Sequence, residues 1–363
     1  MREHNFTAGP AVLPESVVHQ LQSALPNYNN SGLGLMEMSH RSKDFDEIIL
    51  SAENRLRTLL NIPNDYSVLF LQGGASLQFY MSALNLLGPT DIGEYIDTGT
   101  WSSKAAKEAK RCSNSKTIWA PTQGYTRVPK AEEYQPSAEA TYLHYTSNNT
   151  IYGTQFSTTP SGNRLLADLS SDICSRPIDI SAHELIYAGA QKNLGPSGVT
   201  VVILSPWAVE RSRMVNDLRP GGLPSMLNYA LMVDKASLFN TPNTFGIYAL
   251  DRMLAWLQDL GGVSTIATLN TQKSQLLYDK LDASEFWQPH AEKESRSQMN
   301  VTFKIKRLEL EPLFLKEAQA AGLHGLKGHR SVGGLRASIY NACPIESVQA
   351  LVSFMDDFEA KHS

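Results

Sequence analysis

The chain has 363 residues, 42% of them hydrophobic and 19% charged, with a formal net charge of -4 at pH 7. This length exceeds the size at which one hydrophobic core usually keeps growing, so we expect two domains. The slightly acidic balance argues against broad electrostatic binding to nucleic acid or membranes, and an anionic ligand would have to be held by a local group of cations.

Short apolar runs that end in small or acidic residues alternate with helical patterns through most of the chain. Examples of the predicted strands are Ser67–Leu71, Arg164–Asp168, Leu185–Ala188 and Val199–Leu204, and examples of the helix candidates among them are Leu77–Leu87 and Ser102–Arg111. This alternation indicates an α/β fold with a mainly parallel sheet and helices on its faces. Ligands of such sheets gather outside the carboxyl ends of the strands, so we look for chemistry there.

A second region follows Leu250. Its predicted elements are a helix at Thr244–Leu260, a helix at about Val263–Leu281, a strand at Met299–Ile305, a helix near Glu311–Ala321 and a last helix from Pro344 to about Ala360. This order of elements is typical of a smaller α+β domain. We expect a large domain of residues 16–255 and a small domain made of residues 1–15 together with 256–363.

Lys192 follows a predicted apolar strand, lies among small residues and precedes a Gly-rich turn. Small neighbours let a flat ring approach the backbone, and burial lowers the pKa of a lysine amine towards that of a usable nucleophile. A surface lysine in a turn is the ordinary alternative. The preceding apolar strand and the absence of a charged cluster favour the functional interpretation.

Two more junctions carry side chains that suit a ring-shaped cofactor. Asp168 ends a predicted strand, where its carboxylate could pair with a protonated pyridine nitrogen and make the ring an electron sink. A helix cap is an equally reasonable role for this aspartate. Trp101 lies where a strand gives way to a helix and could stack on a planar cofactor, although core and interface tryptophans are as common.

The segment Gln72–Ser76 links a predicted strand to a helix through two glycines. Free backbone N–H groups and the helix dipole converge on an anion at such a junction, and the Ser76 hydroxyl adds a donor. Most Gly-Gly turns only connect elements, so this junction is weak evidence for a phosphate site by itself.

Two His-Arg pairs and a further arginine form local cationic groups. They are His40-Arg41, His329-Arg330 and Arg336. Arginine binds carboxylates and phosphates in a bidentate manner, so the set suits a substrate that carries both groups. Surface loops with salt bridges would explain either pair taken alone.

The three cysteines, Cys112, Cys174 and Cys343, are far apart and form no CxxC pair. They fit neither a zinc site nor a disulfide framework, so we expect no metal and a reducing compartment. The sequence has no N-terminal secretory pattern and no apolar run of about 18 residues that could cross a membrane. We therefore expect a soluble, cytoplasmic protein.

Eight segments, in order, carry a resemblance to a known family. They are Asn5–Pro14, Glu37–Ser42, Asp97–Ser102, Ser147–Gly153, Ala167–Ser171, Ser175–Asp179, Tyr187–Gly198 and Gly325–Ser338. Nearly the whole chain resembles the phosphoserine aminotransferases, in the class V branch of the fold-type I enzymes that depend on pyridoxal phosphate. The resemblance implies a large domain with a mainly parallel seven-stranded sheet flanked by helices, and a smaller α+β C-terminal domain.

The resemblance also implies roles around the cofactor ring. Lys192 would hold pyridoxal phosphate as a Schiff base and then move the proton between the substrate α-carbon and the cofactor. Asp168 would pair with the pyridine nitrogen, and Trp101 would stack on the ring. Thr150 would hydrogen bond the ring's 3-hydroxyl oxygen.

The cofactor phosphate would bind Ala75, Ser76 and Gln191, with Asn240 and Thr241 reaching in from a second subunit. The implied enzyme is therefore a homodimer with its active site at the subunit interface. Some relatives have a bulkier basic residue where this chain has Ser76, so the phosphate contacts follow less directly from the resemblance than the assignment of Lys192 does.

The implied reaction transfers the amino group of L-glutamate to 3-phosphohydroxypyruvate, giving phosphoserine and 2-oxoglutarate. Arg336 would bind the α-carboxylate. The distal phosphate or γ-carboxylate would be surrounded by His40, Arg41, His329 and Arg330, some of them from the second subunit. Activity on 4-phosphohydroxy-threonine, in pyridoxine synthesis, stays open.

Three alternatives remain. Another class V enzyme, such as an alanine–glyoxylate aminotransferase, would not need the doubled His-Arg pairs. A cysteine desulfurase needs a reactive cysteine, and nothing around Cys343 marks it as activated. A protein that only carried the cofactor would not need Arg336.

Overall fold

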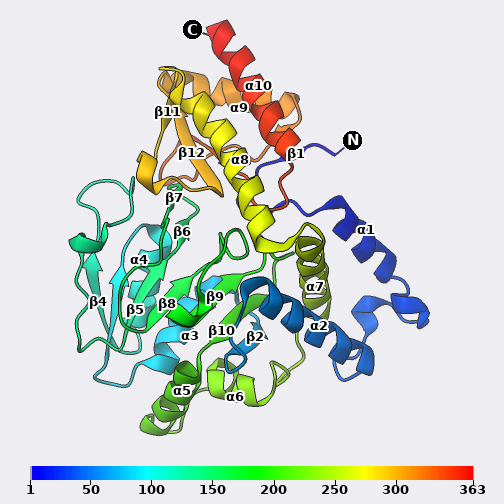
Figure 1. Ribbon diagram of the computed structural model, residues 1–363, viewed down its shortest axis with the longest axis vertical. Helices are drawn as coiled ribbons and strands as arrows, with labels where there is room; N and C mark the ends of the chain where they lie inside the picture. Colours follow the sequence, from blue (N-terminus) through cyan, green and yellow to red (C-terminus); the bar gives the residue numbers. More distant parts are fainter. Residues whose placement is uncertain (1, 363) are drawn as a thin grey trace.

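In the computed structural model, which describes residues 2–362, a seven-stranded sheet lies at the centre of the larger part of the molecule (Figure 1). Its strand order is β2-β10-β9-β8-β5-β3-β4. The strands are β2 (Ser67–Leu71), β3 (Ile92–Ile96), β4 (Asn114–Trp119), β5 (Tyr142–Thr146), β8 (Leu165–Asp168), β9 (His183–Gly189) and β10 (Thr200–Leu204). Only β10 runs against its neighbours, so the predicted mainly parallel sheet is confirmed.

Helices cover both faces of this sheet. They are α1 (Glu15–Ala24), α2 (Lys43–Leu60), α3 (Gly74–Leu86), α4 (Thr100–Ala109), α5 (Pro206–Leu218), α6 (Tyr229–Asp234) and α7 (Thr244–Asp259). In β2, Val68 and Phe70 pack into the core formed with α2 and α7, whereas Leu69 and Leu71 pack against α3, α4 and α5. A strand buried on both faces must be apolar throughout, which explains the continuous apolar runs of the central strands.

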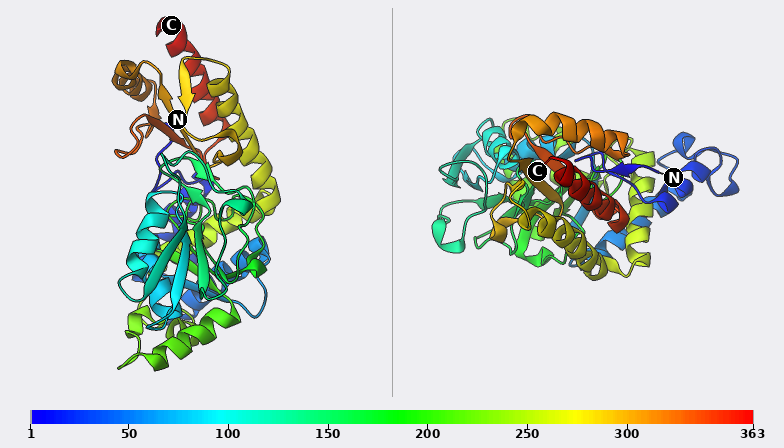
Figure 2. Two further views of the ribbon diagram at one scale, coloured as in Figure 1. Left: turned by 90° about the vertical axis from the view of Figure 1, so that its left-hand side faces the viewer. Right: turned by 90° about the horizontal axis from the view of Figure 1, so that it is seen from above.

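The small domain stands at one end of the molecule's long axis (Figures 1 and 2). Its helices are α8 (Gly262–Asp282), α9 (Glu311–Ala320) and α10 (Ile345–His362). Its antiparallel sheet has the order β11-β12-β14, with β11 (Trp287–Pro289), β12 (Asn300–Ile305) and β14 (Leu335–Ser338). A separate core around Phe303 and Phe314 holds these elements together.

The N-terminal residues join the small domain. Strand β1 (His4–Asn5) pairs in parallel with β13 (Leu323–His324), and Phe6 is buried in the small-domain core. On these contacts we propose residues 1–15 and 256–363 as the small domain and 16–255 as the large one. Met1 and Ser363 lie outside the described residues.

Several predicted boundaries are wrong by a few residues, for local reasons. Helices α3 and α4 begin at Gly74 and Thr100, earlier than predicted; in α3 the added residues Gly74–Ser76 are small and carry no apolar periodicity. The strand predicted from Arg164 begins at Leu165, because Arg164 has a φ of 52°, which a strand residue does not adopt. The last helix begins at Ile345 and extends to His362.

The remaining strands form a short antiparallel pair, β6 (Asn148–Asn149) with β7 (Thr154–Gln155). This hairpin directly follows β5, at the carboxyl edge of the main sheet. Among residues 2–362, none of the helices combines the length and the apolar character that a membrane crossing requires.

Candidate active site

A cavity of about 340 Å³ lies at the carboxyl ends of the parallel strands. It receives side chains from the segments that follow β2, β3, β5, β8 and β9, and from the small domain. Nine of the side chains predicted for a site line it: Ala75, Ser76, Trp101, Thr150, Asp168, Gln191, Lys192, His329 and Arg336. The sheet thus gathers residues that are widely separated in the sequence, as its strand directions require.

Lys192 lies in the turn that follows β9, and its Nζ donates a hydrogen bond to Thr150 Oγ1 at 2.8 Å. Burial lowers the pKa of this amine from 10.5 to about 8, opposed by the Asp168 carboxylate and assisted by the Arg336 charge. About half of such amines are neutral at pH 8, so Lys192 can act as a nucleophile and as a base near neutral pH.

Asp168 is the last residue of β8 and is only 4% exposed. One of its carboxylate oxygens accepts a hydrogen bond from the backbone N–H of Ser170 at 2.9 Å. Burial raises the pKa of this carboxyl, while the Ser170 hydrogen bonds and the Lys192 charge lower it. A buried carboxylate of this kind gains stability from a cationic N–H partner, such as a protonated ring nitrogen.

The junction between β2 and α3 has the backbone geometry of an anion site. Gly73 and Gly74 have φ values of 91° and 65°, and a Cβ on Gly73 would come within 2.5 Å of Leu77. These glycines let the chain turn sharply so that α3 begins beside the cavity, with Ala75 and Ser76 in its first turn. The N–H groups of a first helical turn have no carbonyl partner within the helix, so they are available to a phosphate.

Trp101 forms an aromatic wall of the cavity from the first turn of α4. Its indole Nε1 is buried and has no hydrogen-bond partner among residues 2–362. The Lys104 ammonium lies 4.7 Å from the centre of the indole ring. An aromatic plane, a carboxylate, an amine and a helix N-terminus around one cavity fit a flat, phosphate-bearing ring compound.

Arg336 brings a positive charge to the cavity from β14 of the small domain. Its Nη1 donates to the carbonyl oxygen of Thr150 at 3.2 Å, and its Nε is buried with no partner among residues 2–362. Burial lowers the pKa of this guanidinium, which an anionic ligand would compensate. His329 lies nearby, where burial and the charges of Arg336, Arg330 and Lys104 lower the pKa of its imidazole.

Five predicted residues do not line the cavity of the single chain. They are His40, Arg41, Arg330, Asn240 and Thr241. Arg41 and Arg330 are exposed, and Thr241 lies beside Gln72, whose amide donates to the Thr241 carbonyl at 3.2 Å. Within a single chain, these five residues therefore do not contribute to the lining of the cavity.

The sequence did not assign roles to several residues that the structure places at the cavity. Ala8 and Gly9 line it from the N-terminal segment, where a Cβ on Gly9 would lie 3.5 Å from the Lys192 side chain. Asn148 and Ser171 also line it. All four belong to segments that carried the family resemblance, which was the only signal available for them.

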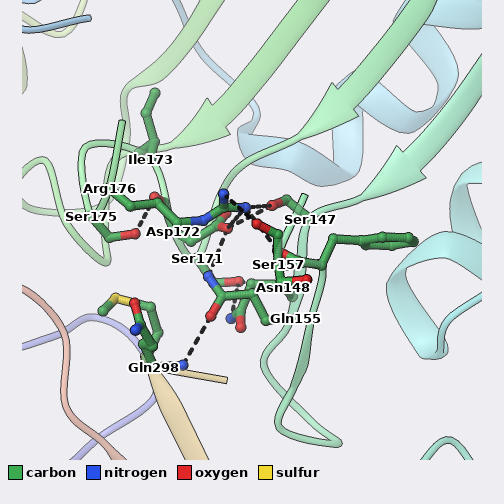
Figure 3. Close-up of polar contacts among 12 residues, drawn as sticks. Ser147, Asn148, Gln155, Ser157, Ser171, Asp172, Ile173, Ser175, Arg176 and Gln298 are labelled. Carbon is green, nitrogen blue, oxygen red and sulfur yellow. Dashed lines mark hydrogen bonds and ion pairs between the residues drawn. The ribbon is translucent and has the colours of Figure 1, made fainter. Parts of the chain in front are cut away.

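Asn148 and Ser171 belong to a largely buried group of polar residues that contact one another (Figure 3). The Asp172 carboxylate accepts hydrogen bonds from Ser147 Oγ at 2.6 Å and Gln155 Nε2 at 3.1 Å, with Arg176 Nη2 at 3.8 Å. Asn148 Nδ2 donates to Ser171 Oγ at 2.9 Å. These contacts fix the segment between β5 and β7 against the loop after β8, so Thr150 and Asp168 keep a defined relation.

The cysteine thiols are not activated. Burial raises the pKa of Cys343 to about 11 and that of Cys174 to about 12. Thiols of this kind stay protonated at neutral pH and are poor nucleophiles, which argues against a cysteine-based reaction. Among residues 2–362, no group of three His, Cys, Asp or Glu side chains could hold a metal ion.

Comparisons with known proteins agree with this geometry. The model of the class-V aminotransferase family matches residues 4–351. The phosphoserine aminotransferase of Geobacillus kaustophilus is 50% identical, and that of Desulfotalea psychrophila 48%, over 99% of this chain and 99% of each relative. The solved phosphoserine aminotransferase of Bacillus circulans subsp. alkalophilus is 45% identical with a TM-score of 0.95, and the match covers 100% of this chain and 99% of that one.

The fold extends to more distant proteins. A solved alanine–glyoxylate aminotransferase from Nostoc sp. is 17% identical, with a TM-score of 0.80 over 99% of this chain and 96% of that chain. At this identity the match concerns the fold alone.

Proposed function

The chain belongs to the class-V aminotransferase family, and we infer that it is a phosphoserine aminotransferase. It transfers the amino group of L-glutamate to 3-phosphohydroxypyruvate and releases phosphoserine and 2-oxoglutarate. The observation that carries this inference is the cavity, where the Lys192 amine, the Asp168 carboxylate, the α3 N-terminus and the Arg336 guanidinium meet. Identities of 48–50% to phosphoserine aminotransferases over nearly the full length support it.

Pyridoxal phosphate, when bound, supplies an electron sink for the electrons left as the substrate α-proton departs. We propose that Lys192 holds it, that Asp168 faces its ring nitrogen and that Trp101 packs on its ring. Thr150 is the proposed partner of the ring hydroxyl. The phosphate is assigned to Ala75, Ser76 and Gln191, which line the same cavity.

The chain's own groups perform the proton transfers and hold the substrate. Once substrate has displaced it, the Lys192 amine is neutral in a useful fraction near pH 8 and can take the α-proton. Arg336 holds the α-carboxylate through charge-assisted hydrogen bonds, which orients the α-carbon towards the lysine. Asp168 stays anionic beside a cationic ring nitrogen, because that pair stabilises both charges.

We propose that the site is completed by a second copy of the chain in a homodimer. His40, Arg41 and Arg330 would then surround the distal anion with His329, and Asn240 and Thr241 would reach the cofactor phosphate. Large apolar side chains support this, because Leu33 and Met36, near the His40-Arg41 pair, are 59% and 69% exposed. Contiguous exposed apolar surface of this kind often marks a protein–protein interface, whereas single exposed apolar side chains do not.

We also propose a cytoplasmic location. Cys112, Cys174 and Cys343 are all free thiols, which fits a reducing compartment.

The inference is tested by amino transfer from L-glutamate to a panel of 2-oxo acids, namely 3-phosphohydroxypyruvate, pyruvate and glyoxylate. We expect a kcat/KM for the phosphorylated acceptor at least 100-fold above the others, since roughly 2.7 kcal/mol of binding to the distal anion gives that ratio. An equal or higher kcat/KM for glyoxylate would contradict the inference.

A further inference from the structure

Lys273 is a buried lysine that lies outside the cavity. It lies on α8, is 2% exposed, and its Nζ points at a group of backbone carbonyls. The ammonium donates to the carbonyl oxygens of Tyr340 at 2.7 Å, Ile339 and Cys343 at 3.1 Å each, and Asn341 at 3.5 Å. All four belong to one loop, Ile339–Cys343, between β14 and α10.

This ammonium has no carboxylate partner, since the salt bridges among residues 2–362 do not include Lys273. Burying a charge without a counter-ion is costly unless dipoles replace the lost water. Here four carbonyl dipoles do so, and they would repel one another without the cation between them. The charge therefore holds the loop carbonyls close together, which an apolar side chain of equal length could not do.

The loop held by Lys273 contacts the turn that carries Lys192. The backbone N–H of Asn341 donates to Asn193 Oδ1 at 3.0 Å, and Asn193 directly follows Lys192. Asn193 Nδ2 in turn donates to the carbonyl of Ile173 at 3.0 Å, in the loop after Asp168. Through Asn193, the loop is thus connected to the turn that carries Lys192 and to the segment that follows Asp168.

The same loop contacts two further parts of the cavity wall. The Tyr340 hydroxyl donates to the carbonyl of Ala8 at 2.7 Å, and Ala8 lines the cavity. The loop also follows directly after β14, the strand that carries Arg336. Helix α8 holds the loop a second time through Asn270, whose Nδ2 donates to Asn341 Oδ1 at 2.9 Å.

We propose that Lys273 is a positioning residue of the active site. Its ammonium gathers the Ile339–Cys343 carbonyls, and this loop fixes the Lys192 turn relative to Arg336. The role in catalysis rests on the proposed function, whereas the structural coupling does not. A misplacement of about 1 Å between a reacting group and its substrate lowers a rate by about 10²-fold, so positioning at a distance has measurable consequences.

The test compares Lys273→Met with Lys280→Met in the full-length holoenzyme. Met keeps the length of the side chain and removes the charge. Lys280 is the matched control, because it lies on the same helix but pairs with Asp356 at 2.5 Å and Glu359 at 2.7 Å on α10. Three quantities are measured: kcat and KM, the visible circular dichroism of the bound cofactor, and hydrogen exchange of peptides covering residues 190–194 and 339–343.

We expect Lys273→Met to lower kcat by roughly 10- to 100-fold, to change the visible dichroism and to speed exchange in both peptides. Lys280→Met should leave all three near wild type. A folded Lys273→Met protein with unchanged kcat, dichroism and exchange at residues 190–194 would overturn the proposal. Faster exchange confined to residues 339–343 would also overturn it, because the loop would then not be coupled to the lysine turn.

If Lys273→Met yields no folded protein, Asn341→Ala loosens the same loop without changing the buried charge, because it removes the side-chain hydrogen bonds of Asn341 with Asn270 and with the Cys174 carbonyl. It should speed exchange at residues 190–194 and alter the dichroism, and wild-type values for both would overturn the proposal. Dichroism and exchange need no substrate. A wild-type enzyme inactive on 3-phosphohydroxypyruvate would therefore contradict the proposed function while leaving this coupling to be judged by its own measurements.

Discussion

The amine of Lys192 and the hydroxyl of Thr150 are hydrogen bonded at 2.8 Å, although 42 positions separate them in the sequence. The first follows β9 and the second follows β5, two strands on either side of β8 with its Asp168. This places a nucleophile and a hydroxyl on one wall of the cavity, with a buried carboxylate on the strand between them.

Thr150→Val removes this hydroxyl while keeping the shape of the side chain. A hydrogen bond to a charged group contributes about 1.5–3 kcal/mol, so we expect kcat to fall roughly 10- to 100-fold. Thr150→Ser keeps the hydroxyl and should retain most of the activity. Steady-state kinetics of both variants check this, and a Val variant as active as the Ser variant would remove Thr150 from the site.

Asp168→Asn removes the charge opposite the ring nitrogen without changing the volume. Loss of a preorganised electrostatic partner costs roughly 10²–10³-fold in rate, so we expect kcat to fall by that factor with little change in KM. Asp251→Asn is the comparison, since Asp251 is also a buried carboxylate but does not line the cavity. Equal losses of kcat in the two variants would show that Asp168 has no special relation to the cofactor.

Arg336 and Arg330 should affect different parts of the substrate. Arg336→Lys removes bidentate binding of the α-carboxylate, so kcat/KM should fall about 10- to 100-fold for glutamate and for phosphoserine alike. Arg330→Ala should lower kcat/KM for phosphoserine more than for alanine, which has no distal anion. Equal losses for phosphoserine and alanine would contradict the assignment of Arg330 to the distal anion.

The lowered pKa of Lys192 also predicts a stability effect in protein freed of cofactor. The folded pKa is about 8 and the ordinary value is 10.5, so between these pH values the unfolded chain binds more protons. The free energy of unfolding therefore rises with pH between pH 8 and pH 10.5 because of this group. Below pH 8 the amine is charged in the folded state as well, and the destabilisation caused by burying its charge is complete.

Lys192→Met should accordingly raise the free energy of unfolding by roughly 1–3 kcal/mol at pH 7, and by less at pH 9.5. Urea unfolding of the cofactor-free proteins at both pH values measures this difference. The exposed Lys43→Met variant serves as the control and should show no such trend. A gain that grew with pH would mean that the charge is not buried in the folded state.

Much of the site could be predicted from the sequence, because parallel strands place their carboxyl ends at one edge. Lys192, Asp168 and the glycines after β2 all followed from this rule, together with the residue types that a ring, an amine and a phosphate require. Strand β4 gave no such signal. It is an edge strand with mostly polar, partly exposed residues, so it lacks the apolar run of the central strands.

Contacts between the domains could not be predicted in this way. Asn341 meets Asn193 across 148 positions, and Asn148 meets Asn300 across 152 positions. No periodicity records such pairs, because they depend on how two separately folded cores are placed against each other. The positions of His40, Arg41 and Arg330 depend further on a second chain, which a single sequence describes only through family resemblance.

The central claim is that Lys192 carries the cofactor, and chemical reduction tests it most directly. Sodium borohydride fixes pyridoxal phosphate onto the lysine that holds it, and digestion followed by mass spectrometry identifies the peptide. We predict the added mass on the peptide that contains Lys192, and on no other. The mass on Lys273, whose pKa is also lowered to about 8, would contradict the account.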